Sequence, residues 1–359
     1  MASWRRVTGV AGIAAAAAAA GAGVLLAAEK IAIGRIRLRP DAEAGEPLGQ
    51  LRGRPLVVLA DDGVPLHAEI SGPDHAPVTI IFSHGYTLNQ DVWHYQRAKL
   101  AGAARLVFWD QRSHGRSGRS APEHVSITQL GADLYAVLQA STPGSGPVLL
   151  VGHSMGGMTV MALAGQHPEL FGTKVTGVAL ISTAASGVDP TAFLPPLLRP
   201  VARTAAAPLL RGVSPGRRGA LVDRGRQAAS DLAFLGTRFI AFGDPRVSPA
   251  VVDFLERIIR DTPTEVVAQF YLALLGHDQR AALGVLGRVP VVVLTGDADR
   301  LVPPRLSDEL AAAIPGAELI KVPGAGHVVI LERPDVVNAA IESLIATVSA
   351  GSSSRGQSA

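Results

Sequence analysis

Short apolar runs separated by amphipathic stretches characterise the chain from Pro55 onward. Six of these runs are apolar almost throughout, which is typical of strands buried on both faces of a parallel sheet. They are Val78–Phe82, Arg105–Trp109, Val148–Val151, Val175–Ser182, Val291–Leu294 and Leu319–Val322. Helical patterns fall between them, at Ser126–Leu138, Met158–Gln166, Ser307–Ala313 and Pro334–Ile345. The alternation of strands and helices predicts a doubly wound α/β sheet.

Two more strands are predicted at the start of this region. Leu56–Leu59 and Leu66–Ile70 are both rich in apolar residues, and the turn signal Asp61-Asp62-Gly63 lies between them. A turn signal between two apolar runs predicts an antiparallel hairpin. The sheet is therefore expected to have eight strands, most of them parallel.

The alternation stops between residues 187 and 286, where the pattern becomes helical. Apolar residues recur at helical spacing in Leu232–Phe242, Val251–Ile259 and Glu265–Leu275, after a Pro-broken stretch at Leu194–Leu210. We interpret these residues as a helical cap inserted into the α/β core. Six of the nine phenylalanines lie in it, namely Phe193, Phe234, Phe239, Phe242, Phe254 and Phe270. Either they pack a small helical layer, or they form an apolar roof over a substrate pocket.

The 359-residue chain carries a net charge of +3, but its basic excess is confined to the N-terminus. Residues 1–54 hold eight Lys and Arg against four acidic residues, which leaves 25 basic and 26 acidic residues in the remainder. A domain that binds nucleic acid needs a clustered positive face, so no nucleic-acid partner is expected. Because the chain contains no cysteine, disulfides, zinc-thiolate sites and a cysteine nucleophile are excluded.

An uncharged stretch from Val7 to Ala28, preceded by Arg5 and Arg6, has the character of a targeting segment. Its 22 residues are long enough to cross a bilayer, which would make it a membrane anchor. Alternatively, it is a signal peptide with a small-x-small cleavage site at Ala20-Gly21-Ala22, or a disordered Ala-rich leader. The first two alternatives predict a membrane-anchored or exported protein, and the third a cytoplasmic one.

These patterns divide the chain into four parts. Residues 1–54 are the leader with its basic flank, and residues 187–286 are the helical cap. Residues 55–186 and 287–349 form the α/β core. The Gly- and Ser-rich tail, residues 350–359, is predicted to be disordered.

One apolar run leads directly into Gly152-His153-Ser154-Met155-Gly156-Gly157, which contains the pattern G-x-S-x-G. In a sharp strand-to-helix turn, glycines beside the serine let neighbouring backbones approach closely. The Ser154 hydroxyl then projects from the carboxyl edge of the sheet. The N–H of Met155 lies at a helix N-terminus, where it stabilises an oxyanion. A phosphate-binding loop is the rival interpretation, but Met158 stands where such a loop needs lysine.

A serine nucleophile needs a base, and the base needs an orienting acid. The strand Val291–Leu294 is followed by Thr295-Gly296-Asp297-Ala298-Asp299, and Gly326-His327 follows the last predicted strand. Loops that follow parallel strands meet at one edge of the sheet, so these side chains are expected to lie near Ser154. His327 is the candidate base, and both Asp297 and Asp299 are candidates for the acid.

A second oxyanion donor is expected in the loop after Val78–Phe82. There the sequence Ser83-His84-Gly85-Tyr86 offers the N–H of Tyr86, next to a glycine that permits an unusual backbone path. His84 is interpreted as a structural hydrogen-bonding residue, because it precedes the nucleophile in the chain and lies on the wrong loop for the base. The sequence Asp110–Ser117, after the next strand, is interpreted as a structural turn behind the site.

In their joint order these motifs resemble the α/β-hydrolase superfamily, and specifically its cap-bearing esterases, lipases, perhydrolases and epoxide hydrolases. The resemblance covers residues 55–349 and depends on His84-Gly85, Asp110–Ser117, Gly152–Gly157, Gly296–Asp299 with Pro303, and Gly326-His327. It implies the α/β-hydrolase fold, a mostly parallel eight-stranded sheet flanked by helices with an inserted helical cap. It also implies that Asp299 is the acid. Relatives that open epoxides or displace halide carry Asp where this chain has Ser154, so the resemblance argues against both chemistries.

The expected function is hydrolysis of carboxylic esters, lipid esters included, by the catalytic residues Ser154, Asp299 and His327 through an acyl-enzyme. No cofactor is expected, and no metal, since no H-E-x-x-H motif occurs. The expected partner is a small-molecule ester with an apolar acyl or alkyl group, and membrane association would involve residues 7–28. The alternatives are an acyltransferase or perhydrolase with the same triad, cleavage of an amide, thioester or carbon–carbon bond, and a hydrolase-like binding protein with a dormant triad.

Overall fold

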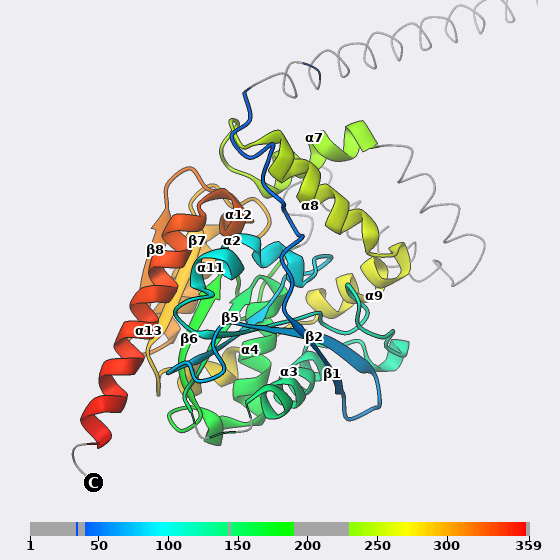
Figure 1. Cartoon of the computed structure of the whole chain (residues 1–359). Helices are drawn as coiled ribbons and strands as arrows, with labels where there is room; N and C mark the ends of the chain where they lie inside the picture. Colours follow the sequence, from blue (N-terminus) through cyan, green and yellow to red (C-terminus); the bar gives the residue numbers. More distant parts are fainter. Residues whose placement is uncertain (1–33, 35–39, 143, 145, 190–229, 357–359) are drawn as a thin grey trace, which may run out of the picture.

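The computed structural model describes Gly34 and residues 40–142, 144, 146–189 and 230–356 (Figure 1). Two segments interpreted from the sequence lie outside these ranges, the uncharged stretch from Val7 to Ala28 and the Pro-broken stretch Leu194–Leu210. Among the residues that are described, no helix combines the length and the apolar character needed to cross a membrane.

One eight-stranded sheet forms the centre of the molecule, in the order β1-β2-β4-β3-β5-β6-β7-β8. Its strands are β1 (Arg54–Leu59), β2 (Pro65–Ser71), β3 (Thr79–Ser83), β4 (Arg105–Trp109), β5 (Val148–His153), β6 (Val175–Ile181), β7 (Val291–Gly296) and β8 (Glu318–Val322). Pairing is antiparallel between β1 and β2 and between β2 and β4, and parallel between all other neighbours. The predicted mostly parallel, eight-stranded α/β sheet is confirmed, and so is the hairpin at its start.

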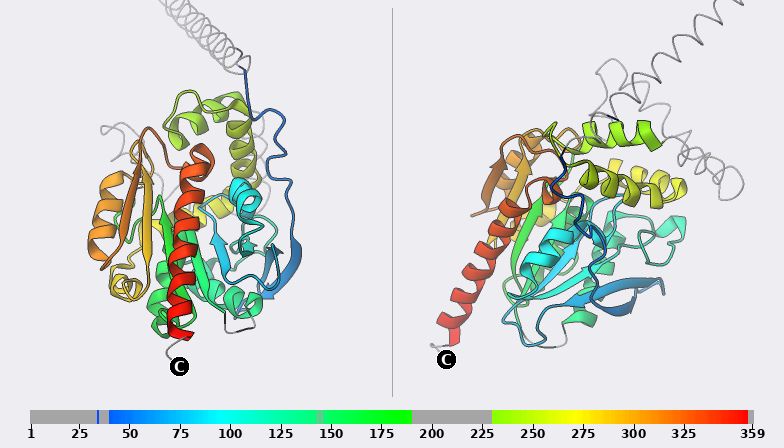
Figure 2. Two further views of the ribbon diagram at one scale, coloured as in Figure 1. Left: turned by 60° about the vertical axis from the view of Figure 1, so that its left-hand side comes forward. Right: turned by 45° about the horizontal axis from the view of Figure 1, so that its top comes forward.

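Helices cover both faces of this sheet. They are α2 (His94–Leu100), α3 (Ile127–Ser141), α4 (Met155–Gln166), α10 (Leu283–Leu286), α11 (Pro304–Ala313), α12 (Val329–Glu332) and α13 (Pro334–Gly356). Short 3-10 helices lie at Gln90–Trp93 (η1), Pro122–His124 (η2), Pro168–Leu170 (η3) and Arg280–Ala282 (η4). The left-hand view of Figure 2 shows α13 along one face of the sheet.

The central strands are apolar throughout because successive side chains point to opposite faces, both of which are covered. In β5, Val148 and Leu150 pack in one hydrophobic cluster with residues of α3, α4 and α10. Leu149 and Val151 pack in the other cluster with residues of α2, α12 and α13. Full burial of a Val or Leu side chain contributes about 1.5–3 kcal/mol, so each strand stabilises both layers.

Helix boundaries differ from the sequence-based prediction by a few residues, and in three helices the difference has an identifiable cause. Helix α4 starts at Met155 rather than Met158, because two glycines of low helix propensity hide its first turn in the sequence. Helix α11 starts at Pro304, a residue that is favoured in the first turn. Helix α13 continues to Gly356, so residues 350–356 are helical, whereas their composition predicted disorder. Once a helix is nucleated, each further residue adds a backbone hydrogen bond, which outweighs the weak propensity of serine.

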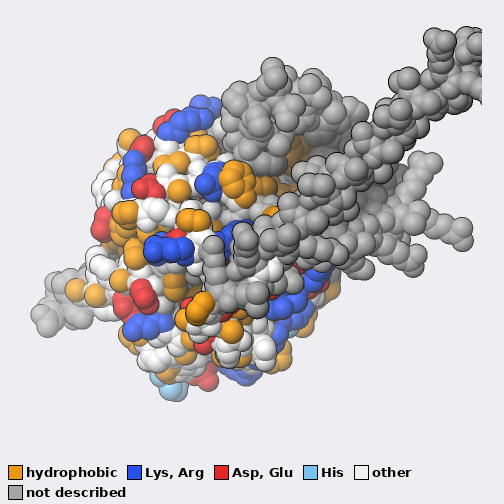
Figure 3. Space-filling model, turned by 90° about the horizontal axis from the view of Figure 1, so that it is seen from above, with side chains coloured by type: hydrophobic (Ala, Val, Ile, Leu, Met, Phe, Trp, Pro, Cys, Tyr) orange, Lys and Arg blue, Asp and Glu red, His pale blue; other side chains and the backbone are white. Residues whose placement is uncertain are grey.

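The helical insertion lies beyond one end of the sheet and contains α7 (Ser230–Ala241), α8 (Pro249–Asp261) and α9 (Thr264–Leu275) (Figure 1). Four of its phenylalanines are buried in the hydrophobic clusters and so pack the helical layer: Phe234, Phe242, Phe254 and Phe270. Phe239 is 61% exposed, and Phe193 lies outside the described residues. The segment η4–α10, which the sequence assigned to the cap, packs against α4 of the core. Figure 3 looks down on this end and shows basic, acidic and hydrophobic side chains interspersed on the described surface.

Residues 40–53, predicted as part of the leader, run over the folded body and connect two helices (Figure 1). Asp41 accepts a hydrogen bond of 2.6 Å from Ser248 Oγ at the start of α8. On the side of α2, Tyr95 OH donates to the Glu43 carboxylate at 2.7 Å. The globular body therefore begins before the predicted boundary between leader and core.

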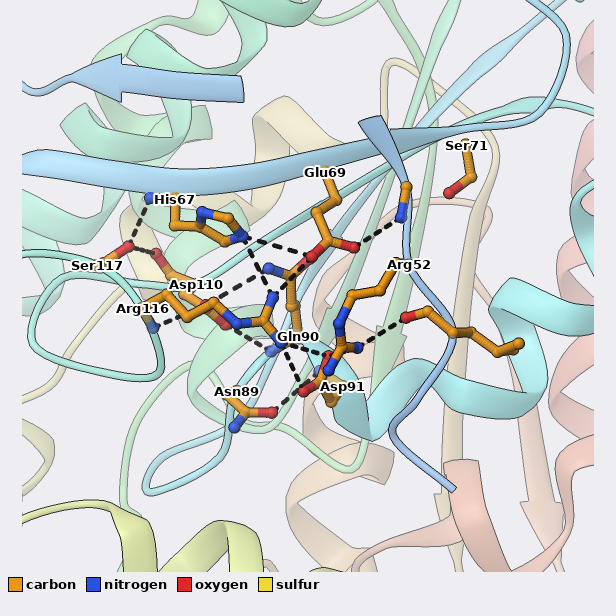
Figure 4. A network of polar contacts seen from close by, with 12 residues as sticks. Arg52, His67, Glu69, Ser71, Asn89, Gln90, Asp91, Asp110, Arg116 and Ser117 are labelled. Atoms are coloured by element: carbon orange, nitrogen blue, oxygen red, sulfur yellow. Dashed lines mark hydrogen bonds and ion pairs between the residues drawn. The ribbon is translucent and has the colours of Figure 1, made fainter. Parts of the chain in front are cut away.

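A network of charged side chains surrounds the turn Asp110–Ser117 (Figure 4). Arg116 donates to Glu69 of β2 at 2.7 Å and to Asp91 of η1 at 2.9 Å. Arg52, from the segment before β1, also donates to Asp91, at 3.0 Å. Within the turn, the Asp110 carboxylate accepts the N–H of Arg116 at 2.9 Å. These contacts are those of a structural turn, and they connect it to residues 40–53.

Candidate active site

Ser154 lies at the turn between β5 and α4, with φ 52° and ψ −119°. A positive φ in a residue other than glycine is strained and costs on the order of 1–3 kcal/mol. In addition to hydrogen bonds from the first turn of α4, two bonds with β6 and the loop after it hold this backbone: Ser154 N donates to Ile181 O at 2.9 Å, and Thr183 Oγ1 donates to Ser154 O at 2.7 Å. The strained turn places the residue at the carboxyl end of a central strand.

The glycines around Ser154 let three backbones meet. A Cβ added to Gly152 would lie 2.5 Å from Gly156 O, and a Cβ on Gly156 would lie 2.0 Å from Ser83 O. Both distances are far below van der Waals contact, so a larger residue at either position would displace backbone. Helix α4 therefore starts directly against the end of β3, and the loop that follows β3 lies beside Ser154.

His327 and Asp299 form a hydrogen-bonded pair at the same edge of the sheet. His327 Nδ1 and Asp299 Oδ2 lie 2.8 Å apart, and both residues are buried. Asp299 Oδ1 accepts the N–H groups of Leu301 and Val302, each at 2.9 Å, and these bonds fix the carboxylate. With Nδ1 donating to Asp299, Nε2 is the nitrogen of His327 that can accept a proton.

Asp297, the other candidate for the acid, makes a different contact. Its Oδ1 accepts the N–H of Gly324 at 2.7 Å, in the loop that leads to His327, and the residue is exposed. Asp299 therefore has the geometry of the histidine's partner, and Asp297 stabilises the neighbouring loop.

The two candidate oxyanion donors lie on the first turn of α4 and on the loop after β3, two segments that meet beside Ser154. Met155 is the first residue of α4, and the N–H groups of a first helical turn have no partner within the helix. Tyr86 belongs to the loop after β3. A Cβ on Gly85 would lie 2.9 Å from His153 Nδ1, so this loop passes directly beside the residue that precedes Ser154.

His84 makes the contacts of a structural residue. Its Nδ1 donates to Gly85 O at 2.8 Å, and its Nε2 accepts the N–H of Gln111 at 2.9 Å. Burial lowers the pKa of His84 to about 4, so the ring is neutral at pH 7. Because both ring nitrogens are engaged, neither is available to take a proton from a nucleophile.

His153 is a site residue to which the sequence analysis gave no role. Its buried ring donates from Nε2 to His327 O at 3.0 Å. Burial, with a smaller contribution from the charge of His327, lowers the pKa of His153 to about 3. His153 therefore connects the turn that carries Ser154 to the loop that carries His327. Its position beside Ser154 was the available signal in the sequence.

The structure thus brings Ser154, Asp299 and His327 to one edge of the sheet. Ser154 follows His153, and His327 contacts Asp299. In the part of the chain that is described, no hydrogen bond joins Ser154 Oγ to His327. Such bonds are often long before substrate binds and shorten in the complex. Within the same residues, no group of three or more His, Cys, Asp or Glu side chains is arranged to hold a metal ion.

A strained serine between a central strand and a helix, with an Asp-His pair at the same edge of a mostly parallel eight-stranded sheet, is the arrangement of an α/β hydrolase. Residues 80–340 match the model of the family described as "Alpha/beta hydrolase family". The chain belongs to this family. The enzyme class that the motifs predicted is therefore confirmed.

Known proteins show the extent of the similarity. The pimeloyl-(acyl-carrier protein) methyl ester esterase of Stenotrophomonas maltophilia (strain K279a) is 27% identical over 295 residues, which cover 79% of this chain and 98% of that protein. The AB hydrolase superfamily protein YisY of Bacillus subtilis (strain 168) is 26% identical over 263 residues, which cover 73% of this chain and 89% of that protein. The crystal structure of the enol-lactonase from Burkholderia xenovorans LB400 has a TM-score of 0.64 at 25% identity, over 81% of this chain and 100% of that chain.

Proposed function

We propose that this protein is a serine hydrolase that cleaves carboxylic esters, with Ser154 as nucleophile, His327 as base and Asp299 as orienting acid. The observation that carries the proposal is the 2.8 Å contact between His327 Nδ1 and Asp299 Oδ2, at the sheet edge where Ser154 lies. This contact orients the imidazole so that Nε2 accepts the hydroxyl proton. The similarity to proteins named as a methyl ester esterase and an enol-lactonase supports the choice of ester substrates.

The reaction proceeds through an acyl-enzyme. His327 Nε2 takes the proton of Ser154 Oγ while this oxygen attacks the ester carbonyl carbon. The N–H groups of Met155 and Tyr86 donate to the oxyanion of the tetrahedral intermediate. His327 then gives the proton to the leaving alcohol. Water repeats the same steps at the acyl carbon and releases the acid, which regenerates Ser154.

In this proposal the helical insertion acts as the cap of the site. Tyr86 OH donates to Val267 O of α9, and the ring of Phe270 lies 4.9 Å from that of His114 in the Asp110–Ser117 turn. A site roofed by apolar helices favours esters with an apolar acyl or alkyl group. Lipid esters belong to this class, and an enzyme anchored through residues 7–28 would meet them at a membrane.

The test combines a fluorophosphonate probe with a panel of chromogenic esters of increasing acyl length. Ser154→Ala is expected to abolish labelling and to lower kcat by about 10⁶-fold. Asp299→Asn should lower kcat by about 10⁴-fold, because the neutral amide allows the wrong imidazole tautomer and does not stabilise the imidazolium that forms. Asp297→Asn is the matched control, and its kcat should stay close to that of the wild type.

The products distinguish the alternatives. Acid and alcohol as products support the hydrolase, whereas transfer to an added alcohol or to peroxide identifies an acyltransferase or a perhydrolase. Preferential turnover of an amide, a thioester or a carbon–carbon bond would replace esters as the substrate class. A folded wild-type protein that does not react with the probe is a binding protein with a dormant triad. Near-wild-type activity in Ser154→Ala would contradict the proposal.

A further inference from the structure

The Glu332 carboxylate joins two segments that are far apart in the chain. Glu332 is the last residue of α12 and is 8% exposed. Its Oε2 accepts the N–H of Gly326 at 2.7 Å, and its Oε1 accepts those of Asp244 at 2.6 Å and Gly243 at 3.1 Å. Gly326 directly precedes His327, whereas Gly243 and Asp244 connect α7 to α8. One buried side chain therefore contacts both the helical insertion and the loop between β8 and His327, called the histidine loop below.

The α7–α8 connection is seated directly on the histidine loop. A Cβ on Gly243 would lie 2.4 Å from Gly324 O, and a Cβ on Gly326 would lie 2.6 Å from Gly243 N. In addition, Val328 N donates to Ala241 O at 3.1 Å. These are contacts between backbones, which cannot adjust by changing a rotamer. A shift of the insertion is therefore transmitted to the loop.

The chemistry of the contact requires a carboxylate. Three N–H groups converge on Glu332, and an ionised carboxylate offers two oxygens with about four lone-pair sites to accept them. Hydrogen bonds to a charged acceptor are also about twice as strong as neutral ones. A glutamine in this position would offer one oxygen and would turn its own N–H groups toward the backbone donors.

We propose that Glu332 is a positioning residue that makes the placement of His327 depend on the seating of the helical insertion. This inference rests on the proposed function, in which His327 is the base. The His327 backbone is held from two sides: Glu332 holds the N–H of the preceding residue, and His153 holds the carbonyl of His327 itself. When the insertion is seated, its two N–H donors fix the Glu332 carboxylate, and the loop is aligned. When the insertion moves away, Glu332 loses both of these donors. Its carboxylate is then less well fixed, and its hydrogen bond to the N–H of Gly326 is weakened.

The test compares Glu332→Gln with Asp335→Asn in the full-length protein. Both substitutions remove one negative charge, but Asp335 is exposed on α13, outside these contacts. The first measurement is the proton NMR signal of the hydrogen between His327 Nδ1 and Asp299 Oδ2, which needs no substrate. We expect Glu332→Gln to shift or broaden this signal and Asp335→Asn to leave it unchanged.

The second measurement separates kcat from KM for a short chromogenic ester. Displacement of a catalytic group by about 1 Å lowers rates on the order of 10²-fold, and kcat of Glu332→Gln should fall by that order. KM should stay close to the wild-type value, because a short acyl group makes few contacts with the insertion. A substitution that only lowered the stability of the folded protein would reduce the melting temperature and leave kcat of the folded enzyme unchanged.

Gly243→Ala tests the same dependence from the other side, with Glu332 intact. The added methyl group would push the α7–α8 connection away from Gly324, and the NMR signal and kcat should change as in Glu332→Gln. If circular dichroism shows that Glu332→Gln does not fold, the NMR signal and kcat of Gly243→Ala provide the test of the proposal. Either variant, folded and with the wild-type NMR signal and kcat, would overturn the proposal. A wild-type protein that does not react with fluorophosphonate contradicts the serine hydrolase instead, and the NMR comparison still tests Glu332.

Discussion

Lowering the pH from 7 to 5 is expected to destabilise the folded protein through three buried histidines. His84, His114 and His153 are 0% exposed, and burial lowers their pKa values to about 4, about 3 and about 3. In the unfolded chain the pKa of histidine is about 6.5. Below that pH the unfolded chain binds protons that the folded chain does not. The stability is therefore complete above about pH 6.5 and is lost as the pH falls toward the folded-state pKa values.

The size of the effect follows from these pKa values. Each histidine that is protonated only in the unfolded chain costs about 1.4 kcal/mol per pH unit. Between pH 6.5 and pH 5 this amounts to about 2 kcal/mol for one histidine and about 6 kcal/mol for three. In the unfolded chain carboxylates titrate near pH 4. In the folded chain burial raises the pKa values of Asp91, Asp110 and Asp133, so protons bound by these groups as the pH falls offset part of the loss. Folded proteins are stable by about 5–15 kcal/mol, so a loss of this size is a large fraction of the total stability.

Urea unfolding followed by circular dichroism at pH 7, 6 and 5 measures this loss. In His114→Gln one titrating group is absent, so the loss between pH 7 and pH 5 should shrink by about 2 kcal/mol. This variant is also less stable at every pH, because the ring of His114 packs against Phe270 at 4.9 Å. The quantity to compare is therefore the change with pH. His75→Gln removes an exposed histidine and should lose as much stability as the wild type.

Two results would refute this reasoning. A wild-type free energy of unfolding that changes by less than about 1 kcal/mol between pH 7 and pH 5 would show that the buried histidines do take up protons in the folded state. Equal losses in His114→Gln and the wild type would show the same for His114 alone.

Five further substitutions, at four positions, give measurable outcomes. Gly156→Ala should destabilise the protein by about 3 kcal/mol or more in urea unfolding, because the new Cβ would lie 2.0 Å from a backbone oxygen. Gly165→Ala, in the same helix but 3.6 Å from its nearest neighbour, should stabilise it by about 0.5–1 kcal/mol, and the opposite order would contradict the packing argument. Arg112→Met should cost about 3–5 kcal/mol in the same assay, because it leaves the buried Asp133 carboxylate without the guanidinium that lies 2.6 Å away. His153→Phe should lower kcat for a chromogenic ester by about 10-fold through the lost hydrogen bond to the base. His153→Gln can still donate a hydrogen bond and should recover part of the kcat that His153→Phe loses. A wild-type kcat in both variants would refute a positioning role for His153.

The central strands of the sheet were predictable because they are buried on both faces and are therefore apolar almost without interruption. The region of η1 and α2, residues 90–100, gave no such signal. Its inward side carries polar residues, including Gln96 and Arg97, that are buried through hydrogen bonds rather than through apolar character. Arg97, for example, contacts Glu69 at 2.9 Å. A pattern based on hydrophobicity counts such positions as exposed.

The arrangement of the candidate site was predictable where it depends on particular side chains, and not where it depends on contacts to backbone atoms. The strained turn at Ser154 needs small neighbours, which the G-x-S-x-G pattern records. The choice between Asp297 and Asp299 was open from the residues alone, because both follow β7 at similar spacing. His153 and Glu332 were missed because each contacts backbone N–H or C=O groups, and a pattern of side chains does not reveal such partners. For His153 the only signal was its position beside Ser154.

The helical insertion contacts three loops at the carboxyl edge of the sheet, those after β3, β6 and β8, and these contacts limit how it can open. Helix α9 reaches the loop after β3, where Tyr86 OH donates to Val267 O. The residues after α9 reach the loop after β6, where His277 Nε2 donates to Ala184 O at 3.0 Å. The α7–α8 connection reaches the histidine loop through Glu332. Opening as one rigid body would break all three sets together, at about 1 kcal/mol for each hydrogen bond, whereas movement of one helix breaks one set. In the proposed hydrolase, substrate entry by local movement is therefore favoured, and movement of the α7–α8 connection would displace the loop that carries His327, the proposed base.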